Sequence, residues 1–98
     1  MKIDSKKEGT VLTVTVEGSI DTVTAPDLEA ELKSQWDGVT SLVLDFTDVS
    51  FISSAGIRVI LWAHKQINSR GRMILKNVNG DVREVFELTG LNSVLNFE

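Results

Sequence analysis

Val49-Ser50-Phe51-Ile52-Ser53-Ser54-Ala55-Gly56-Ile57-Arg58 is the stretch in which the sequence pattern changes from that of a strand to that of a helix. Before it, Leu42-Val43-Leu44 is a continuous apolar run, typical of a central strand buried on both faces. After it, one helical side is formed by Ile57, Ile60, Leu61, His64 and Ile67, and Arg70-Gly71 closes the element. Two adjacent serines therefore fall at the start of a predicted helix.

Two further strands are predicted before this stretch. Residues 10–16 alternate, with β-branched residues throughout, which places Leu12, Val14 and Val16 on one face of a strand. Residues 2–7 form a weaker candidate strand, and Glu8-Gly9 between the two suits a hairpin turn. We expect these strands to pair antiparallel.

A helix is predicted between the second strand and the central one. Thr24 is placed as its N-cap and Pro26 in its first turn, where the missing N–H costs nothing. Asp37-Gly38 ends it, and its apolar stripe consists of Ala25, Leu28, Leu32 and Trp36.

The C-terminal third predicts a strand, a helix and a short last strand. The strands cover residues 73–78 and 94–97, with a turn at Asn79-Gly80. Gly90 fits a left-handed helix cap after a helix striped by Val82, Val85, Phe86 and Thr89. The order β-β-α-β-α-β-α-β argues for an α/β fold, a mixed sheet packed by helices with right-handed crossovers. No linker divides it, so we expect one domain over residues 1–98.

Composition narrows the function classes. The chain has 98 residues and a formal charge of −4 with both signs interspersed, so it lacks the basic stripe that nucleic acid requires. It has no cysteine, which excludes disulfides and thiolate metal sites. The N-terminus lacks the apolar stretch of a signal peptide, and no apolar run is long enough to cross a membrane. We expect a cytoplasmic protein with no metal and no cofactor.

The serine pair allows three interpretations. One hydroxyl can cap the helix, which contributes about 1 kcal/mol. The unpaired N–H groups of a helix start also tolerate a phosphate attached to a serine there, which would make a switch. Catalysis by Ser54 is disfavoured, because the only histidine, His64, lies about 15 Å along the same predicted helix. Asp21, Asp45 and Asp48 are more typical of turns and strand ends than of catalytic sites.

The segment DFTDVSFISSAGIRVIL followed by WAHKQI resembles the signature of STAS domains, specifically the stand-alone anti-sigma factor antagonists of bacteria. Gly18-Ser19-Ile20-Asp21 with Thr24-Ala25, and Val85 to Leu91, match in the same order and spacing. The resemblance implies a mixed sheet with helices on one side. It also implies that the unphosphorylated protein binds an anti-sigma factor with serine kinase activity and frees a sigma factor. Phosphorylation of one serine then ends binding, and a phosphoserine phosphatase reverses it.

The family pattern corresponds to residues 51–56. In order, it consists of an aromatic residue, an apolar residue, a position where Asp is frequent, the phosphorylated Ser, a small residue and Gly. Ser54 is the phosphorylation site that the resemblance implies. Ser53 stands where Asp is frequent and Ala55 where a second Ser or Thr is frequent, departures that bear on phosphorylation efficiency more than on the fold. Gly56 matches the pattern, and Asp21 matches a loop that lies near the same surface in the family.

Helical spacing independently suggests a contact surface. Ser54, Arg58 and Trp62 share one stripe, opposite the core-facing side of their helix. Trp and Arg are enriched at binding hot spots. Alternatively, Trp62 packs on a neighbouring loop or strand. The predicted partner-binding residues are Asp21, Ser53, Ser54, Ala55, Gly56, Arg58 and Trp62.

The sequence therefore favours a non-enzymatic interaction switch with no catalytic residue of its own. The alternative is a STAS-like accessory or ligand-binding subunit of a transport or sensory assembly, which would work without a phosphorylation switch. Phosphorylation distinguishes the two hypotheses. Because the chain has no P-loop, the antagonist hypothesis requires a partner that carries the ATP and Mg²⁺.

Overall fold

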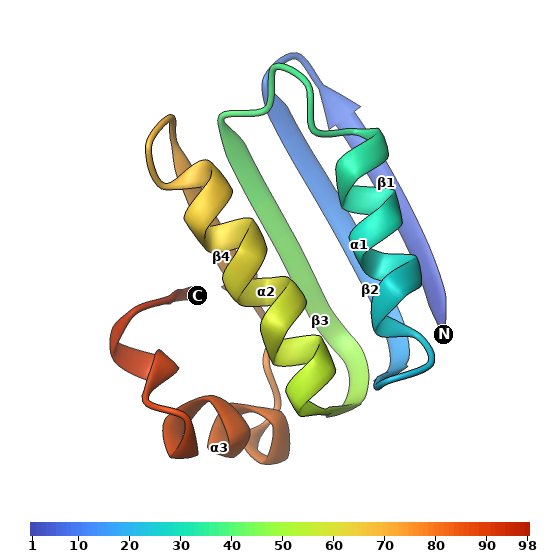
Figure 1. The fold of residues 1–98 in the computed structure, drawn as a ribbon, viewed down its shortest axis with the longest axis vertical. Coiled ribbons are helices and arrows are strands. Elements are labelled where there is room, and N and C mark those ends of the chain that lie inside the picture. Colours follow the sequence, from blue (N-terminus) through green and yellow to red (C-terminus); the bar gives the residue numbers. More distant parts are fainter.

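The computed structural model describes all residues, Met1–Glu98, as a five-stranded sheet with helices α1 and α2 lying side by side across one face (Figure 1). Its elements, in chain order, are β1 (Lys2–Glu8), β2 (Val11–Ile20), α1 (Ala25–Ser34), β3 (Ser41–Ile52), α2 (Ser54–Ile67), β4 (Arg72–Lys76), α3 (Gly80–Leu88), a 3₁₀ turn (Leu91–Ser93) and β5 (Asn96–Phe97). The predicted α/β class and element order are confirmed. No helix is long and apolar enough to span a membrane.

The strands lie in the order β1-β2-β3-β4-β5, which makes β3 the central strand, as predicted. β1 pairs antiparallel with β2, and every later pair is parallel. Parallel neighbours require a crossover, and α1, α2 and α3 each provide one. The carboxyl ends of β2, β3 and β4 therefore all point to the same end of the sheet, the lower end in Figure 1.

The hydrophobic core lies between the sheet and the helices. Alternate strand residues face it and are no more than 1% exposed, namely Leu12, Val14, Val16, Leu42, Leu44, Met73 and Leu75. The helices contribute Leu28 and Leu32 from α1 and Ile60, Ala63 and Ile67 from α2. The expectation that residues 42–44 are buried on both sides is wrong. Val43 is only half-buried, because α1 and α2 cover a single face.

Several predicted boundaries differ from the structure. β2 continues to Ile20, because it stays paired with β3 across two shifts in strand register. One of these shifts lies beside Gly18, which adopts φ +102°. α1 ends at Ser34, so Trp36 lies in the following loop. In α2, Leu61 and His64 were predicted on the same side as Ile57, Ile60 and Ile67, but they are only half-buried and do not belong to the core.

The C-terminal elements are shorter than predicted. β4 ends at Lys76, since Asn77 adopts a left-handed φ of 59°. Asn79 is the N-cap of α3, and its side chain accepts a hydrogen bond from Val82 N at 2.9 Å. Gly90, at φ +77°, forms the predicted left-handed cap. β5 has two residues rather than four.

Candidate functional site

The carboxyl ends of β2 and β3 bring two loops together at one end of the sheet. Ile20 pairs with Ile52 in the strand register, and Ser53 N donates a hydrogen bond to Ile20 O at 2.8 Å. The loop that carries Asp21 and the start of α2 are therefore neighbours, although they are about 30 residues apart in the chain. The resemblance predicted this juxtaposition.

The two serines have different roles at the start of α2. Ser53 is the N-cap, with extended backbone (ψ 177°), and its Oγ accepts a hydrogen bond from Gly56 N at 3.4 Å. Ser54 is the first residue of the helix, is exposed, and its hydroxyl makes no hydrogen bond. The capping interpretation thus applies to Ser53, and the Ser54 hydroxyl takes no part in the cap.

Gly56 holds the helix start against the strand ends. A Cβ at this position would lie 2.6 Å from Ile52 Cγ1 and 2.9 Å from the carbonyl oxygen of Ile20. Real side chains do not approach this closely, so only glycine fits here. Gly56 is buried and shapes the site from below rather than from its surface.

Asp21 forms the turn that leads into α1. Its Oδ1 accepts hydrogen bonds from Thr24 N and Val23 N, both at 3.0 Å. The Thr24 N–H, with smaller contributions from the Thr24 hydroxyl and Val23 N–H, lowers the pKa of Asp21 below its ordinary value. Thr24 occupies the N-cap position of α1, but its side chain makes no cap hydrogen bond and instead donates to Ser19 O at 2.7 Å. Asp21 therefore positions this loop beside Ser54.

A groove of about 360 Å³ lies between α1 and α2 and begins at Ala55, the residue after Ser54. Ala55 and Val59 form its floor on the α2 side, with Arg58 and Trp62 further along the same helix. On the α1 side it is lined by Ala25, Pro26 and Glu29, with Thr22 at the preceding turn. Two residues of the predicted stripe, Arg58 and Trp62, thus line this groove, whereas Ser54 does not.

Trp62 is half-buried and packs on the loop after α1. Its ring centroid lies 5.2 Å from that of Trp36, and Lys33 Nζ lies 5.3 Å from the Trp62 ring. The packing alternative for Trp62 is therefore present in the structure. The same ring also lines the groove, so the packing does not remove it from the surface.

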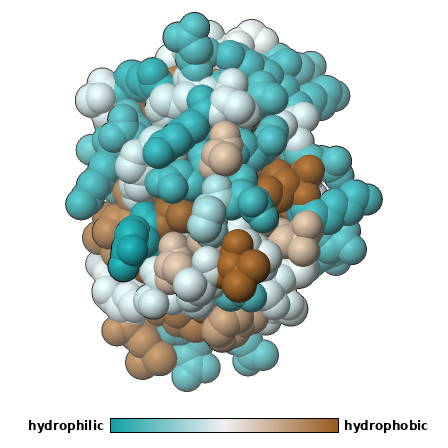
Figure 2. Space-filling model, turned by 45° about the vertical axis from the view of Figure 1, so that its right-hand side comes forward, coloured by the Kyte–Doolittle hydropathy of each residue, from teal (hydrophilic) through white to brown (hydrophobic).

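Two exposed apolar side chains near the serines were not predicted as surface features. Val23, in the turn held by Asp21, is 81% exposed, and Phe51, at the end of β3, is 51% exposed. On the face drawn in Figure 2, the upper part is mostly hydrophilic, whereas hydrophobic residues reach the surface in the middle and lower parts. A single apolar residue among the polar residues of the loop Asp21–Thr24 was the available signal for Val23.

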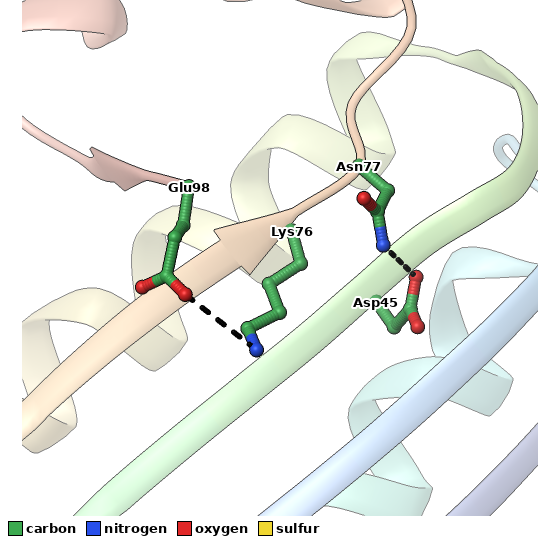
Figure 3. Close-up of polar contacts among 4 residues, drawn as sticks. All are labelled: Asp45, Lys76, Asn77 and Glu98. Atoms are coloured by element: carbon green, nitrogen blue, oxygen red, sulfur yellow. Dashed lines mark hydrogen bonds and ion pairs between the residues drawn. The ribbon is translucent and has the colours of Figure 1, made fainter.

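Asp45 lies outside the site. Its Oδ1 accepts hydrogen bonds from Thr47 Oγ1 at 2.6 Å and from Asn77 Nδ2 at 3.2 Å. Figure 3 shows the contact between Asn77 and Asp45 beside the Lys76–Glu98 ion pair, in which the nitrogen and oxygen lie 3.5 Å apart. The Thr47 hydroxyl is the largest cause that lowers the pKa of Asp45. These contacts tie the middle of β3 to the end of β4, which is a structural role.

Comparison with known proteins agrees with this architecture. The model of the STAS domain family matches residues 2–98. The Bordetella bronchiseptica protein BtrV, named as an anti-sigma factor antagonist, is 38% identical over 96 residues, which cover 96% of this chain and 83% of BtrV.

Two solved structures are similar over nearly the whole chain. One is an anti-sigma factor antagonist from Mycobacterium paratuberculosis, with a TM-score of 0.88 and 26% identity, covering 98% of this chain and 83% of that one. The other is the phosphorylated form of the Bacillus cell fate determinant SpoIIAA, with a TM-score of 0.77 and 21% identity, covering 99% and 91%. The second likeness concerns the fold alone.

Proposed function

The chain belongs to the STAS domain family, and from this premise we propose that it is an anti-sigma factor antagonist whose binding is switched off by phosphorylation of Ser54. In its unphosphorylated form it binds an anti-sigma factor and thereby frees a sigma factor. It is a regulatory binding protein and acts in the cytoplasm, where the sigma factor works. The names of its relatives, together with 38% identity over nearly the whole chain, support the antagonist function.

The observation that carries the choice of residue is the contrast between the two serines. The Ser53 hydroxyl is half-buried and accepts the cap hydrogen bond from Gly56 N, whereas the Ser54 hydroxyl is exposed and unbonded. A kinase must bring the γ-phosphate of ATP within bonding distance of the acceptor oxygen. Only the Ser54 hydroxyl offers that access without breaking the helix cap.

The anti-sigma factor supplies the kinase activity, with its own ATP and Mg²⁺. The Ser54 hydroxyl loses its proton to a base of the kinase, its Oγ forms a bond to the γ-phosphorus, and the bond to the β,γ-bridging oxygen breaks to release ADP. A phosphatase reverses the change by transferring the phosphoryl group to water. This chain contributes the nucleophile but performs neither reaction.

The added phosphate affects the partner more than the fold. It introduces about −1.5 to −2 charges at a position that is already exposed. The backbone N–H groups of Ser54 and Ala55 have no hydrogen-bond acceptor in the structure, so the helix start tolerates negative charge. A docked partner would instead have to bury an unpaired dianion, which is costly. Binding is therefore lost while the fold persists.

Phosphorylation assays on serine variants test this function. The wild type, Ser53→Ala and Ser54→Ala are incubated with the anti-sigma factor and ATP, and the phosphate is located by mass spectrometry. We expect labelling of the wild type and Ser53→Ala at Ser54, and none of Ser54→Ala. Ser53→Ala should be less stable by about 1 kcal/mol from the lost cap. Phosphate on Ser53 would show that Ser54 is not the switch residue, and no phosphate with any anti-sigma factor kinase would favour the accessory-subunit alternative.

A further inference from the structure

Arg58 carries an unpaired charge at the edge of the groove. Of the two charged residues that line the groove, Glu29 already forms an ion pair with Lys33 at 3.6 Å, one turn along α1. Arg58 is exposed and forms neither an ion pair nor a hydrogen bond. The groove thus combines an apolar floor with one free positive charge.

Arg58 also lies one helical turn after Ser54. Residues four apart on a helix are neighbours, with about 5–6 Å between their Cβ atoms. Long helical side chains tend to lean toward the N-terminus, so the Arg58 guanidinium can reach the turn that carries Ser54. The same guanidinium can therefore bind either a ligand in the groove or a group attached to Ser54.

We propose that Arg58 is the residue through which phosphorylation releases the partner. In the unphosphorylated chain, Arg58 binds a carboxylate of the anti-sigma factor, whose docked segment places an apolar side chain on Ala25, Val59 and Trp62. After phosphorylation, the phosphate on Ser54 forms an ion pair with the same guanidinium and displaces the partner's carboxylate. This inference rests on the proposed function for its partner, and on the free charge beside an apolar groove for the acidic and apolar character of that partner.

The chemistry of the two anions explains the exchange. Arg binds carboxylates and phosphates through the same pair of parallel N–H donors. A phosphate on the same helix competes at high effective concentration, and its two charges outweigh the single charge of a carboxylate. The partner then loses its ion pair and also meets a like charge in its place. Release therefore combines a lost attraction with a new repulsion.

The interaction between Arg58 and the phosphate on Ser54 is tested without any kinase. Phosphoserine is installed at position 54 by genetic encoding, and the second pKa of its phosphate is measured by ³¹P NMR. We expect Arg58→Gln to raise this pKa by roughly 0.3 units or more, because the stabilising cation is gone. Lys65→Gln is the matched control, since it removes an equal charge about 16 Å along the same helix and should change nothing. Equal values for Arg58→Gln and wild type would overturn the proposal.

The interaction between Arg58 and the partner is tested by measuring how tightly each variant binds the anti-sigma factor that phosphorylates Ser54. We expect Arg58→Gln to bind roughly tenfold more weakly than wild type and with a weaker dependence on salt. Arg58→Lys should retain part of the affinity and Lys65→Gln all of it, while circular dichroism confirms that each variant is folded. Wild-type affinity of Arg58→Gln would contradict the proposal. Failure of a kinase to label Ser54 would contradict the proposed function alone, because the NMR test uses phosphate installed independently.

Discussion

The rings of Trp36 and Trp62 lie with their centroids 5.2 Å apart and tilted by 37°, and this contact joins the loop after α1 to the middle of α2. Arg70 adds to it from the turn after α2, since its guanidinium lies 5.2 Å from the Trp36 ring and donates to Trp36 O at 3.1 Å. The two helices that border the groove are thus fixed relative to each other at the end away from Ser54. Because Trp62 also lines the groove, this contact holds one of the groove's walls in place.

Trp36→Ala should therefore destabilise the fold by roughly 2 kcal/mol, because about half of a large aromatic surface loses its contacts. Trp36→Phe should cost much less, since a ring remains to pack on Trp62. Urea unfolding of both variants measures the difference. Equal stability of the alanine variant and wild type would show that the tryptophan pair does not fasten the helices.

Leu44→Ala should destabilise the fold by roughly 2–5 kcal/mol. Leu44 is fully buried on the central strand, so the change removes apolar contacts and leaves a cavity. Val43→Ala, on the half-buried opposite face, should cost clearly less. Denaturant melts of the pair give the comparison, and similar losses would mean that both faces of β3 are equally packed.

Gly56→Ala should destabilise the fold by about 1–3 kcal/mol, because a methyl group would overlap Ile52 and the backbone of Ile20. Gly80→Ala is the matched control at the start of α3, where a Cβ meets nothing within 4 Å. Alanine there should be neutral or slightly stabilising, since it favours a helix more than glycine does. Thermal melts distinguish the two, and a neutral Gly56→Ala would show that α2 can move away from the strand ends.

Acid should destabilise the fold through Asp45. Hydrogen bonds, chiefly from the Thr47 hydroxyl, lower the pKa of Asp45 in the folded state, so the unfolded chain binds the proton more readily. Its stabilising contribution is therefore present above the unfolded pKa of about 3.9 and is lost as the pH falls through the folded pKa. Denaturant melts between pH 5 and about pH 2 should show a smaller loss for Asp45→Asn than for wild type. Identical acid profiles would rule out this contribution.

The sequence predicted the alternation of β2 correctly, because it depends on local hydrophobic periodicity. It also predicted the central position of β3, although the burial on both faces from which this was inferred is absent, since Val43 is only half-buried. Leu12, Val14 and Val16 all face the core as expected. The end of β3 was less predictable, since its last six residues mix polar and apolar side chains around irregular pairing with β2. Pairing between distant segments, rather than local propensity, extends that strand to Ile52.

The site shows a similar limit. Residue spacing placed Ser54, Arg58 and Trp62 on one stripe, but it could not distinguish Ser53 from Ser54 as the cap. That choice depends on the backbone of one residue, since Ser53 adopts ψ 177° and turns its hydroxyl onto Gly56 N. The helical spacing could not predict the contact of Trp62 with Trp36 either, because α1 ends at Ser34 and Trp36 lies in a loop.

The central claim is that phosphate on Ser54 ends partner binding without unfolding the chain. Titration calorimetry of the anti-sigma factor against the chain with and without phosphoserine at position 54 tests it most directly, with Ser54→Ala as the uncharged control. We predict tight binding of the unmodified chain and of Ser54→Ala. The phosphorylated chain should bind at least a hundredfold more weakly, which corresponds to about 2.7 kcal/mol, while melting within about 1 kcal/mol of the unmodified one. Equal affinity of the phosphorylated and unmodified chains would contradict the account.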